Sequence, residues 1–187
     1  MGEAFPLAPL FATLVLRQYS ERMLRAGAGE TTTHPAGAAS IIFWYCSYSV
    51  LLVLACLSLW GTPPGASEWL GYVILWAGIT LRQLSLHQIG AYYHVLIVIR
   101  ERHRLVDTGP YRFLRHPLHL GLHLEMLGLA ILAGAALGWL VLAASLLVLV
   151  RRNRCEEKSM QDFFGVAYEN YRRRSWDLVD LVPGRIA

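Results

Sequence analysis

The chain has 187 residues, a length that suits one ordinary domain. Hydrophobic residues make up 55% of it and charged residues 16%, against about 45–50% and about 25% in average soluble proteins. This composition excludes a disordered chain and favours a membrane protein. Three scattered cysteines, Cys46, Cys56 and Cys155, exclude a disulfide scaffold, and the placement of the basic residues says more than the net charge of +4.

Apolar segments predict the first three of about five transmembrane helices. A membrane helix needs about 20 mostly apolar residues. The N-terminal sequence FPLAPLFATLVL lacks the basic region of a signal peptide, so we expect it to be retained as the first helix. Residues 39–60 carry no charge, and residues 68–86 form the third span. Trp60 and Trp69 then meet one membrane interface across the turn GTPPGAS.

Residues 118–150 predict a hairpin of two short helices. They contain no Lys or Arg over 33 residues, and one helix of that length would measure roughly 50 Å against a hydrocarbon core of about 30 Å. We expect the chain to fold back between Gly134 and Gly138, because Ala130 and these two glycines permit a close approach of the backbones.

The basic residues predict the orientation in the membrane. They form three clusters, within 17–25, 82–115 and 151–185, and five spans place all three on one side. The positive-inside rule then puts the N-terminus outside and the C-terminal tail in the cytosol.

One domain over residues 1–187 follows from this arrangement. Residues 1–86 hold three N-terminal spans with their loops, and residues 87–187 hold a polar loop, the hairpin and the cytosolic tail. The fold class is therefore an all-α integral membrane protein, with a candidate site where the polar loop and the tail meet on the cytosolic side.

Two sequence motifs lie in these polar parts. Residues 103–121 read HRLVDTGPYRFLRHPLHLG, and residues 151–174 read RRNRCEEKSMQDFFGVAYENYRRR. Together they resemble the signature of the isoprenylcysteine carboxyl methyltransferase (ICMT) family, which is HxLVxxGxYxxxRHPxYxG, a short hairpin, an EE pair and FGxxYxxY. The matching residues are His103, Leu105, Val106, Gly109, Tyr111, Arg115, His116, Pro117, Gly121, Glu156, Glu157, Phe164, Gly165, Tyr168 and Tyr171.

The resemblance implies a membrane enzyme that transfers a methyl group from S-adenosyl-L-methionine to a lipophilic acceptor and releases S-adenosyl-L-homocysteine. The cofactor pocket of that family is not a Rossmann fold, and here no GxGxxG motif follows a strand. Arg152 is implied at the acceptor. The positions implied at the cofactor are His103, Arg104, Leu105, Val106, Tyr111, His116, Pro117, Leu118, His119 and Glu156. The chain departs from the pattern at His119, where the family has tyrosine.

The spacing of Arg152 and Glu156 permits two interpretations. The two residues are four apart and share one face of a helix. They either bind the acceptor and the cofactor, respectively, or form an exposed ion pair worth only about 0.3–0.5 kcal/mol. The EE pair in register with the motif favours the first interpretation, so we take Arg152 and Glu156 as the catalytic candidates.

Histidine spacing raises a rival hypothesis, a membrane di-iron hydroxylase or desaturase. His116, His119 and His123 fall on one helical face with an HxxxH spacing that suits a metal. Such enzymes need several histidine boxes, and the other histidines form no second one, so we expect no metal. Glu125 inside the apolar hairpin is a separate functional candidate, because a buried acid is costly in a membrane.

The sequence therefore predicts an S-adenosylmethionine-dependent methyltransferase whose first-choice acceptor is the carboxylate of a prenylated cysteine. A phospholipid amine or a small thiol is the alternative acceptor, and His119 or His116 would serve as a base for the amine. A non-catalytic membrane binding protein remains a competing class. Expected partners are the lipophilic substrate and membrane lipids, with Arg172, Arg173 and Arg174 near anionic headgroups and no nucleic acid.

Overall fold

The computed structural model describes residues 7, 10, 15, 35–61, 63–90 and 105–181, and this part of the chain is all-helical. Its elements are the helices α2 (Pro35–Ser58), α3 (Ala66–Ile89), α4 (Pro117–Ala133), α5 (Ala136–Phe164) and α6 (Val166–Arg174), with two short 3₁₀ helices, η2 (Gly109–Arg112) and η3 (Leu178–Leu181). Within these residues the β-type pairing is a single isolated bridge between Leu114 and Trp176. The predicted all-α class is confirmed, and the predicted first helix lies outside the described residues.

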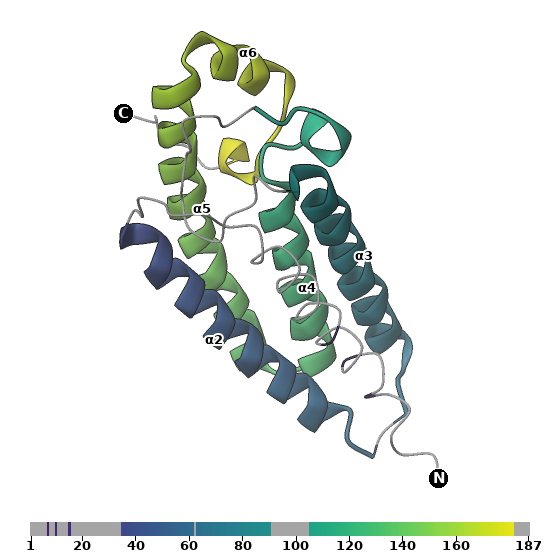
Figure 1. Cartoon of the computed structure of the whole chain (residues 1–187). Helices are drawn as coiled ribbons and strands as arrows, with labels where there is room; N and C mark the ends of the chain where they lie inside the picture. The colour runs from purple at the N-terminus through teal and green to yellow at the C-terminus, as the bar shows by residue number, and fades with distance from the viewer. Residues whose placement is uncertain are drawn as a thin grey trace.

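The four long helices run side by side, and the short elements gather at one end of them (Figure 1). Two helices of the described part are long and apolar enough to cross a membrane, judged by length and composition: Ala39–Ser58 and Ala136–Phe164. Helix α4 is apolar but shorter, and α3 occupies the third predicted span. The count of five spans stays a prediction.

Close backbone contact joins α3 to α4. A β-carbon added at Gly78 would lie 2.6 Å from the main-chain oxygen of Gly121, and one added at Gly128 would lie 2.6 Å from the main-chain oxygen of Gly71. These separations are shorter than any ordinary carbon–oxygen contact, so only glycine fits. The glycines recur every seven residues on each helix and therefore fix how closely the two helices pack.

The apolar residues divide between a core and an outer surface. Leu51, Leu75, Met126 and Leu149 are fully buried and bring α2, α3, α4 and α5 together. Large apolar side chains are exposed on the outer faces of three long helices, among them Ile42, Val53 and Leu57 of α2, Leu70 and Val73 of α3, and Leu137, Leu140 and Leu147 of α5. Such a surface is typical of helices that face lipid.

Helices α4 and α5 are joined by Gly134 and Ala135. Gly134 has a φ of +60°, a conformation that favours glycine, and its N–H bonds to the carbonyls of Ala130 and Ile131. The predicted hairpin of two short membrane helices stays a prediction, and α5, with 29 residues, continues beyond the apolar stretch to Phe164. Its polar second half contains neither Gly nor Pro, so nothing ends the helix before Gly165.

Candidate functional site

A cluster of polar side chains lies where the start of α4 meets the polar half of α5. His116 precedes the first turn of α4, with Pro117 as the first helical residue. Its Nδ1 lies 3.4 Å from Glu156 Oε2, and His119 Nε2 lies 3.9 Å from Glu156 Oε1. The two imidazole rings are stacked, with centroids 5.6 Å apart. The RHP and EE motifs, about 40 residues apart in the sequence, therefore meet at one point.

Arg152 connects this cluster to α2. Its Nε donates to Glu156 Oε1 at 2.8 Å, and an Nη–H donates to the hydroxyl of Ser40 at 2.8 Å. The guanidinium also lies over the ring of Trp44, 5.3 Å from the ring centroid. The Arg152 side chain is 5% exposed and that of Glu156 20% exposed. The pair is thus not an exposed surface ion pair, and helix α2 contributes two residues to the site.

Trp44 forms one wall of the cluster. Its ring is 5.1 Å from that of His119 and 5.7 Å from that of His123, measured between centroids. The indole is 5% exposed, and its Nε1 is buried with no hydrogen-bond partner among the described residues. A buried indole N–H usually has an acceptor, so this donor is available to a ligand.

A second layer supports His119. Its Nδ1 lies 2.7 Å from Asn153 Oδ1, and Asn153 Nδ2 donates to both carboxylate oxygens of Asp177, at 3.1 and 3.0 Å. Asn153 is completely buried and Asp177 is 4% exposed. The chain segment that follows α6 therefore reaches back to the site.

Arg115 fastens that segment in place. The buried guanidinium lies 2.7 Å from Glu157 Oε1 through Nε and 2.6 Å from Asp180 Oδ1 through Nη2. Main-chain bonds add to this attachment, because Arg115 N–H donates to Trp176 O at 2.9 Å and Trp176 N–H donates to Phe113 O at 2.8 Å. The Arg115 guanidinium thus holds together the loop before α4, helix α5 and the segment that follows α6.

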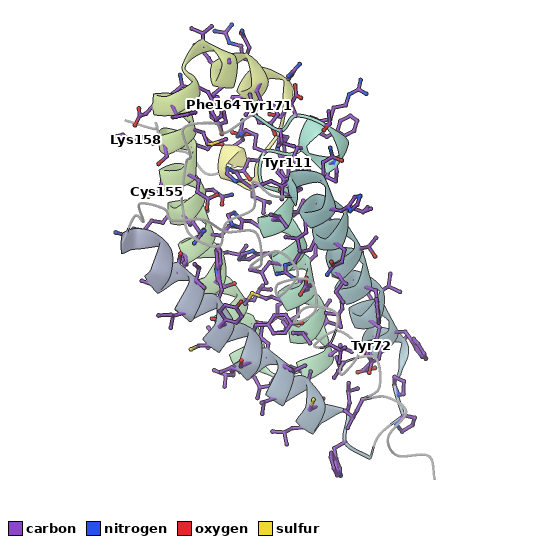
Figure 2. All side chains as sticks on the ribbon, viewed as in Figure 1. Tyr72, Tyr111, Cys155, Lys158, Phe164 and Tyr171 are labelled. Atoms are coloured by element: carbon purple, nitrogen blue, oxygen red, sulfur yellow. The ribbon has the colours of Figure 1, made fainter. Side chains whose placement is uncertain are left out.

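Two tyrosines of the sequence motifs, Tyr111 and Tyr171, lie next to this attachment. The Tyr171 hydroxyl donates to Tyr111 O at 2.8 Å, and Figure 2 shows the two side chains close together at the end of the bundle that carries α6. Burial raises the pKa of Tyr171 to about 12, so it remains a hydrogen-bond donor at neutral pH. Tyr171, the last residue of the FGxxYxxY motif, thus supports the loop that carries Tyr111.

Two charged groups at the loop have shifted pKa values. Burial alone would lower the pKa of His116, but the hydrogen bond and negative charge of Glu156 outweigh it, and the pKa is raised above its usual value. Burial likewise opposes the charge on Arg115, and the carboxylates of Asp180 and Glu157 raise its pKa. His116 is therefore more easily protonated than a free histidine.

The structure brings together part of the predicted residue set. His116, His119, Arg152 and Glu156 form the cluster described above, and Pro117 and Leu118 open α4 beside it. Leu105 and Val106 are partly buried ahead of η2, which contains the buried Tyr111. His103 and Arg104 lie outside the described residues.

The three-histidine face does not converge on one point. His123 Nδ1 lies 2.9 Å from His119 O and its Nε2 lies 3.3 Å from Ser145 O, so both nitrogens face backbone carbonyls. The ligand atoms that do lie within 4.8 Å of one another belong to two sets, His116 with His119 and Glu156, and His116 with Glu157 and Asp177.

Glu125 is buried on α4, where its main chain faces Gly78 of α3.

Sequence reasoning did not find Ser40, Asn153 or Asp177. Ser40 is 112 residues from its partner Arg152, and no spacing rule connects them. Asn153 follows Arg152 directly in the sequence. It therefore lies on a different face of the helix from the one that Arg152 and Glu156 share. Asp177 follows the last motif and becomes relevant only because Arg115 returns the tail to the site.

These features define a class, an all-helical bundle with apolar outer faces and a buried polar cluster at one end. The model of the isoprenylcysteine carboxyl methyltransferase (ICMT) family matches residues 69–162. The chain belongs to this family.

Three comparisons describe its relatives. It is 32% identical to a protein-S-isoprenylcysteine O-methyltransferase of Schizosaccharomyces pombe over 61% of this chain and 49% of that protein. It is 27% identical to the uncharacterized protein YpbQ of Bacillus subtilis over 80% and 88%, respectively. A solved structure of the eukaryotic intramembrane Ras methyltransferase ICMT is similar in fold, with a TM-score of 0.57 and 21% identity over 76% of this chain and 50% of that one. The chain spans about half the length of the named methyltransferase of S. pombe.

Proposed function

We propose that this protein is an S-adenosylmethionine-dependent methyltransferase that acts on a lipophilic acceptor in a membrane. One observation carries the proposal: His116 and His119 from one family motif and Arg152 and Glu156 from the other meet in a buried cluster, with charged or polar atoms 2.8 to 3.9 Å apart. Membership of the ICMT family supports the reaction type.

The residues present suit such a cofactor. It has a carboxylate, an ammonium, a sulfonium charge and ribose hydroxyls, so its site needs both donors and acceptors. Glu156 offers an acceptor, and the buried atoms His116 Nε2 and Trp44 Nε1 have no hydrogen-bond partner among the described residues. We propose that Glu156, His116, His119 and the loop through Leu105, Val106 and Tyr111 hold the cofactor, with His103 and Arg104 as further candidates.

Alignment and exclusion of water are the proposed sources of rate enhancement. When bound, S-adenosylmethionine would supply a methyl group for in-line displacement by the acceptor, with S-adenosylhomocysteine as the leaving group. Arg152, fixed by Ser40 and Trp44, orients an anionic acceptor, and the burial of this cluster keeps water from competing. A carboxylate acceptor has no proton to lose, so its methylation needs no base.

We propose the carboxylate of a prenylated cysteine as the first acceptor, because the relative from S. pombe is named a protein-S-isoprenylcysteine O-methyltransferase. A lipid amine or a thiol is the second candidate, and His119 in place of the tyrosine of the family pattern favours it, since an imidazole can accept a proton. The acceptor enters sideways from the lipid between helices.

The proposed topology has five spans, the α4–α5 hairpin among them, the polar end of the bundle in the cytosol and the N-terminus outside. The apolar outer faces of α2 and α5 support membrane insertion, and the basic residues at the polar end support its cytosolic side. Water-soluble cofactor and lipid-soluble acceptor then reach the cluster from different directions.

Methyl transfer from radiolabelled S-adenosylmethionine by the purified protein in detergent or vesicles tests the function. The acceptors are a farnesylated cysteine, a phospholipid amine and an alkyl thiol, compared side by side. We expect transfer to at least one, and transfer to none of them contradicts the proposal.

Treatment with a strong chelator is expected to leave activity intact, whereas activity that returns only with added iron or zinc favours the di-iron alternative.

A further inference from the structure

The hydrogen bonds between Asp177, Asn153 and His119 can be donated in only one direction, and the chemistry of the carboxylate sets it. An ionised carboxylate only accepts hydrogen bonds, so Asp177 requires the NH₂ group of Asn153 to face it, as it does at 3.1 and 3.0 Å. The carbonyl oxygen of the same amide then faces His119 Nδ1 at 2.7 Å. Because this oxygen can only accept, the proton of the imidazole lies on Nδ1.

Asp177 is itself held in position. Its carboxylate accepts the N–H of Leu178 at 2.8 Å, and its own N–H donates to Asp180 Oδ2 at 3.0 Å. Asp180 is in turn bound to Arg115. The amide of Asn153, 0% exposed, has no room to reverse while this carboxylate remains.

A neutral imidazole protonated on Nδ1 has a lone pair on Nε2. The amide keeps the negative charge of Asp177 out of contact with the ring, so the relay favours the neutral form over the imidazolium. Stacking against His116 and contact with Trp44 fix the plane of the ring. His119 Nε2 is therefore a fixed hydrogen-bond acceptor.

This acceptor faces a second one. Glu156 Oε1 lies 3.9 Å from His119 Nε2, which is too long for a hydrogen bond, and it already receives Arg152 Nε. Two acceptors at this separation repel each other unless a donor lies between them. A primary ammonium group has three N–H donors and a positive charge, so it satisfies both at once, whereas a hydroxyl or thiol has a single donor.

We propose that Asp177 and Asn153 are positioning residues that hold His119 as the Nδ1–H tautomer, and that His119 Nε2 and Glu156 Oε1 together bind a primary ammonium group. The inference rests on the proposed function and deepens it. The ammonium has two possible sources, the amino-acid end of the cofactor and the headgroup of a lipid amine acceptor.

The variant Asp177→Asn tests the relay. The N–H of Leu178 holds the new amide oxygen at the position of Oδ1, so the new NH₂ group takes the position of Oδ2, 3.0 Å from Asn153 Nδ2. Two NH₂ groups then oppose each other, which favours the reversed amide of Asn153 over the original one. Nitrogen-15 NMR of histidine-labelled protein in detergent distinguishes protonated from unprotonated ring nitrogens, and His119→Gln identifies the signals. We expect Nδ1 of His119 to be protonated in the wild type and Nε2 in Asp177→Asn.

Glu169→Gln is the matched control, because it makes the same change from carboxylate to amide at an exposed pair with Arg173 that takes no part in the relay. It is expected to leave the His119 signals unchanged. Asn153→Leu, similar in volume and without polar atoms, gives a second test if Asp177→Asn does not fold. It should produce a mixture of the two tautomers.

Ligand binding separates the two sources of the ammonium. If the cofactor supplies it, the wild type binds S-adenosylhomocysteine at least tenfold more tightly than its analogue without the amino group, and Asp177→Asn loses this preference. If a lipid amine supplies it, this preference is the same in both proteins, and the KM for the lipid amine rises at least tenfold in Asp177→Asn. The inference is overturned if His119 Nε2 is protonated in the wild type, or if Asp177→Asn changes neither the tautomer nor binding. Failure of wild-type protein to bind S-adenosylhomocysteine overturns the proposed function instead.

Discussion

Glu156 lies among three nitrogen atoms, Arg152 Nε at 2.8 Å, His116 Nδ1 at 3.4 Å and His119 Nε2 at 3.9 Å. No other acid of the described cluster is surrounded in this way while keeping 20% of its side chain exposed. The carboxylate is therefore both fixed by the protein and reachable by a ligand. At the scale of single residues, its position suits recognition of a cationic group.

We expect Glu156→Gln to weaken binding of S-adenosylhomocysteine by about 1–2 kcal/mol, because a hydrogen bond to a charged acceptor becomes one to a neutral acceptor. Isothermal titration of the detergent-purified variant measures the change. Glu169→Gln is the control, since Glu169 forms an exposed pair with Arg173 on α6. Equal dissociation constants for wild type and Glu156→Gln would remove Glu156 from the cofactor site.

Arg152→Ala should separate acceptor from cofactor. Loss of an ionic hydrogen bond in a nearly dry site is expected to reduce kcat/KM for a carboxylate acceptor by an amount equivalent to roughly 2–4 kcal/mol. Affinity for S-adenosylhomocysteine should change much less. Arg152→Lys keeps the charge and should recover part of the activity. If kcat/KM and the affinity for S-adenosylhomocysteine fall together, Arg152 supports Glu156 and does not bind the acceptor.

His116 predicts a pH dependence of stability. Its pKa is raised in the folded protein by Glu156, with Glu157 and Asp177 adding to the effect against the opposing burial. A raised folded-state pKa stabilises the protein fully below the unfolded value of about 6.5, and this contribution is lost as pH rises through the folded value. Thermal unfolding between about pH 6 and about pH 9 should show a falling Tm. His116→Gln should flatten this dependence, and an identical slope in the variant would contradict the assignment.

The sequence predicts candidate site residues where a motif carries them and misses the neighbours that long-range packing brings to the cluster. Arg152 and Glu156 are found because helical spacing and the EE motif agree. Ser40 and Asp177 are missed because their partners lie 112 and 24 residues away, respectively, and hydrogen bonding across such distances leaves no local pattern. His123 shows the same limit: helical periodicity places it near His119, but it cannot say which group of α5 the side chain meets, and the structure has the carbonyl of Ser145 there.

At the scale of elements, the contact between α3 and α4 is the most restrictive in the described part of the fold. Apolar length predicts both helices, and their ends follow from Gly90 and Gly134. Which glycines lie in the interface is not readable from apolar length alone. Their seven-residue spacing on both helices is the signal that could have found them.

Gly128→Ala should destabilise the protein, because the added β-carbon would lie 2.6 Å from Gly71 O and the helices must separate. The expected cost is about 1–3 kcal/mol. Gly138→Ala is a matched control, since its β-carbon would meet Leu51 and Ala130 at 3.5 and 3.6 Å, ordinary contact distances. Alanine is also the better helix former there by about 1 kcal/mol. Thermal unfolding in detergent should rank Gly138→Ala at or above the wild type and Gly128→Ala below it, and the reverse order would contradict the packing.

At the scale of the whole molecule, the fold places a polar cluster at the end of an apolar bundle. Composition predicts the apolar bundle, because a chain with 55% hydrophobic residues must bury them either in a large core or in a membrane. The closing of the site by α6 and the C-terminal segment depends on Arg115, whose partners Glu157 and Asp180 come from separate elements. The central claim is that this closed polar end binds S-adenosylmethionine.

Direct titration of the wild-type protein in detergent with S-adenosylhomocysteine tests that claim, with adenosine as the comparison ligand. We predict saturable binding of one S-adenosylhomocysteine per chain with a dissociation constant in the micromolar range. Adenosine should bind more weakly, because it lacks the charged groups that Glu156 and its neighbours recognise. Absence of micromolar binding by folded protein, or equal affinity for adenosine, would contradict the account.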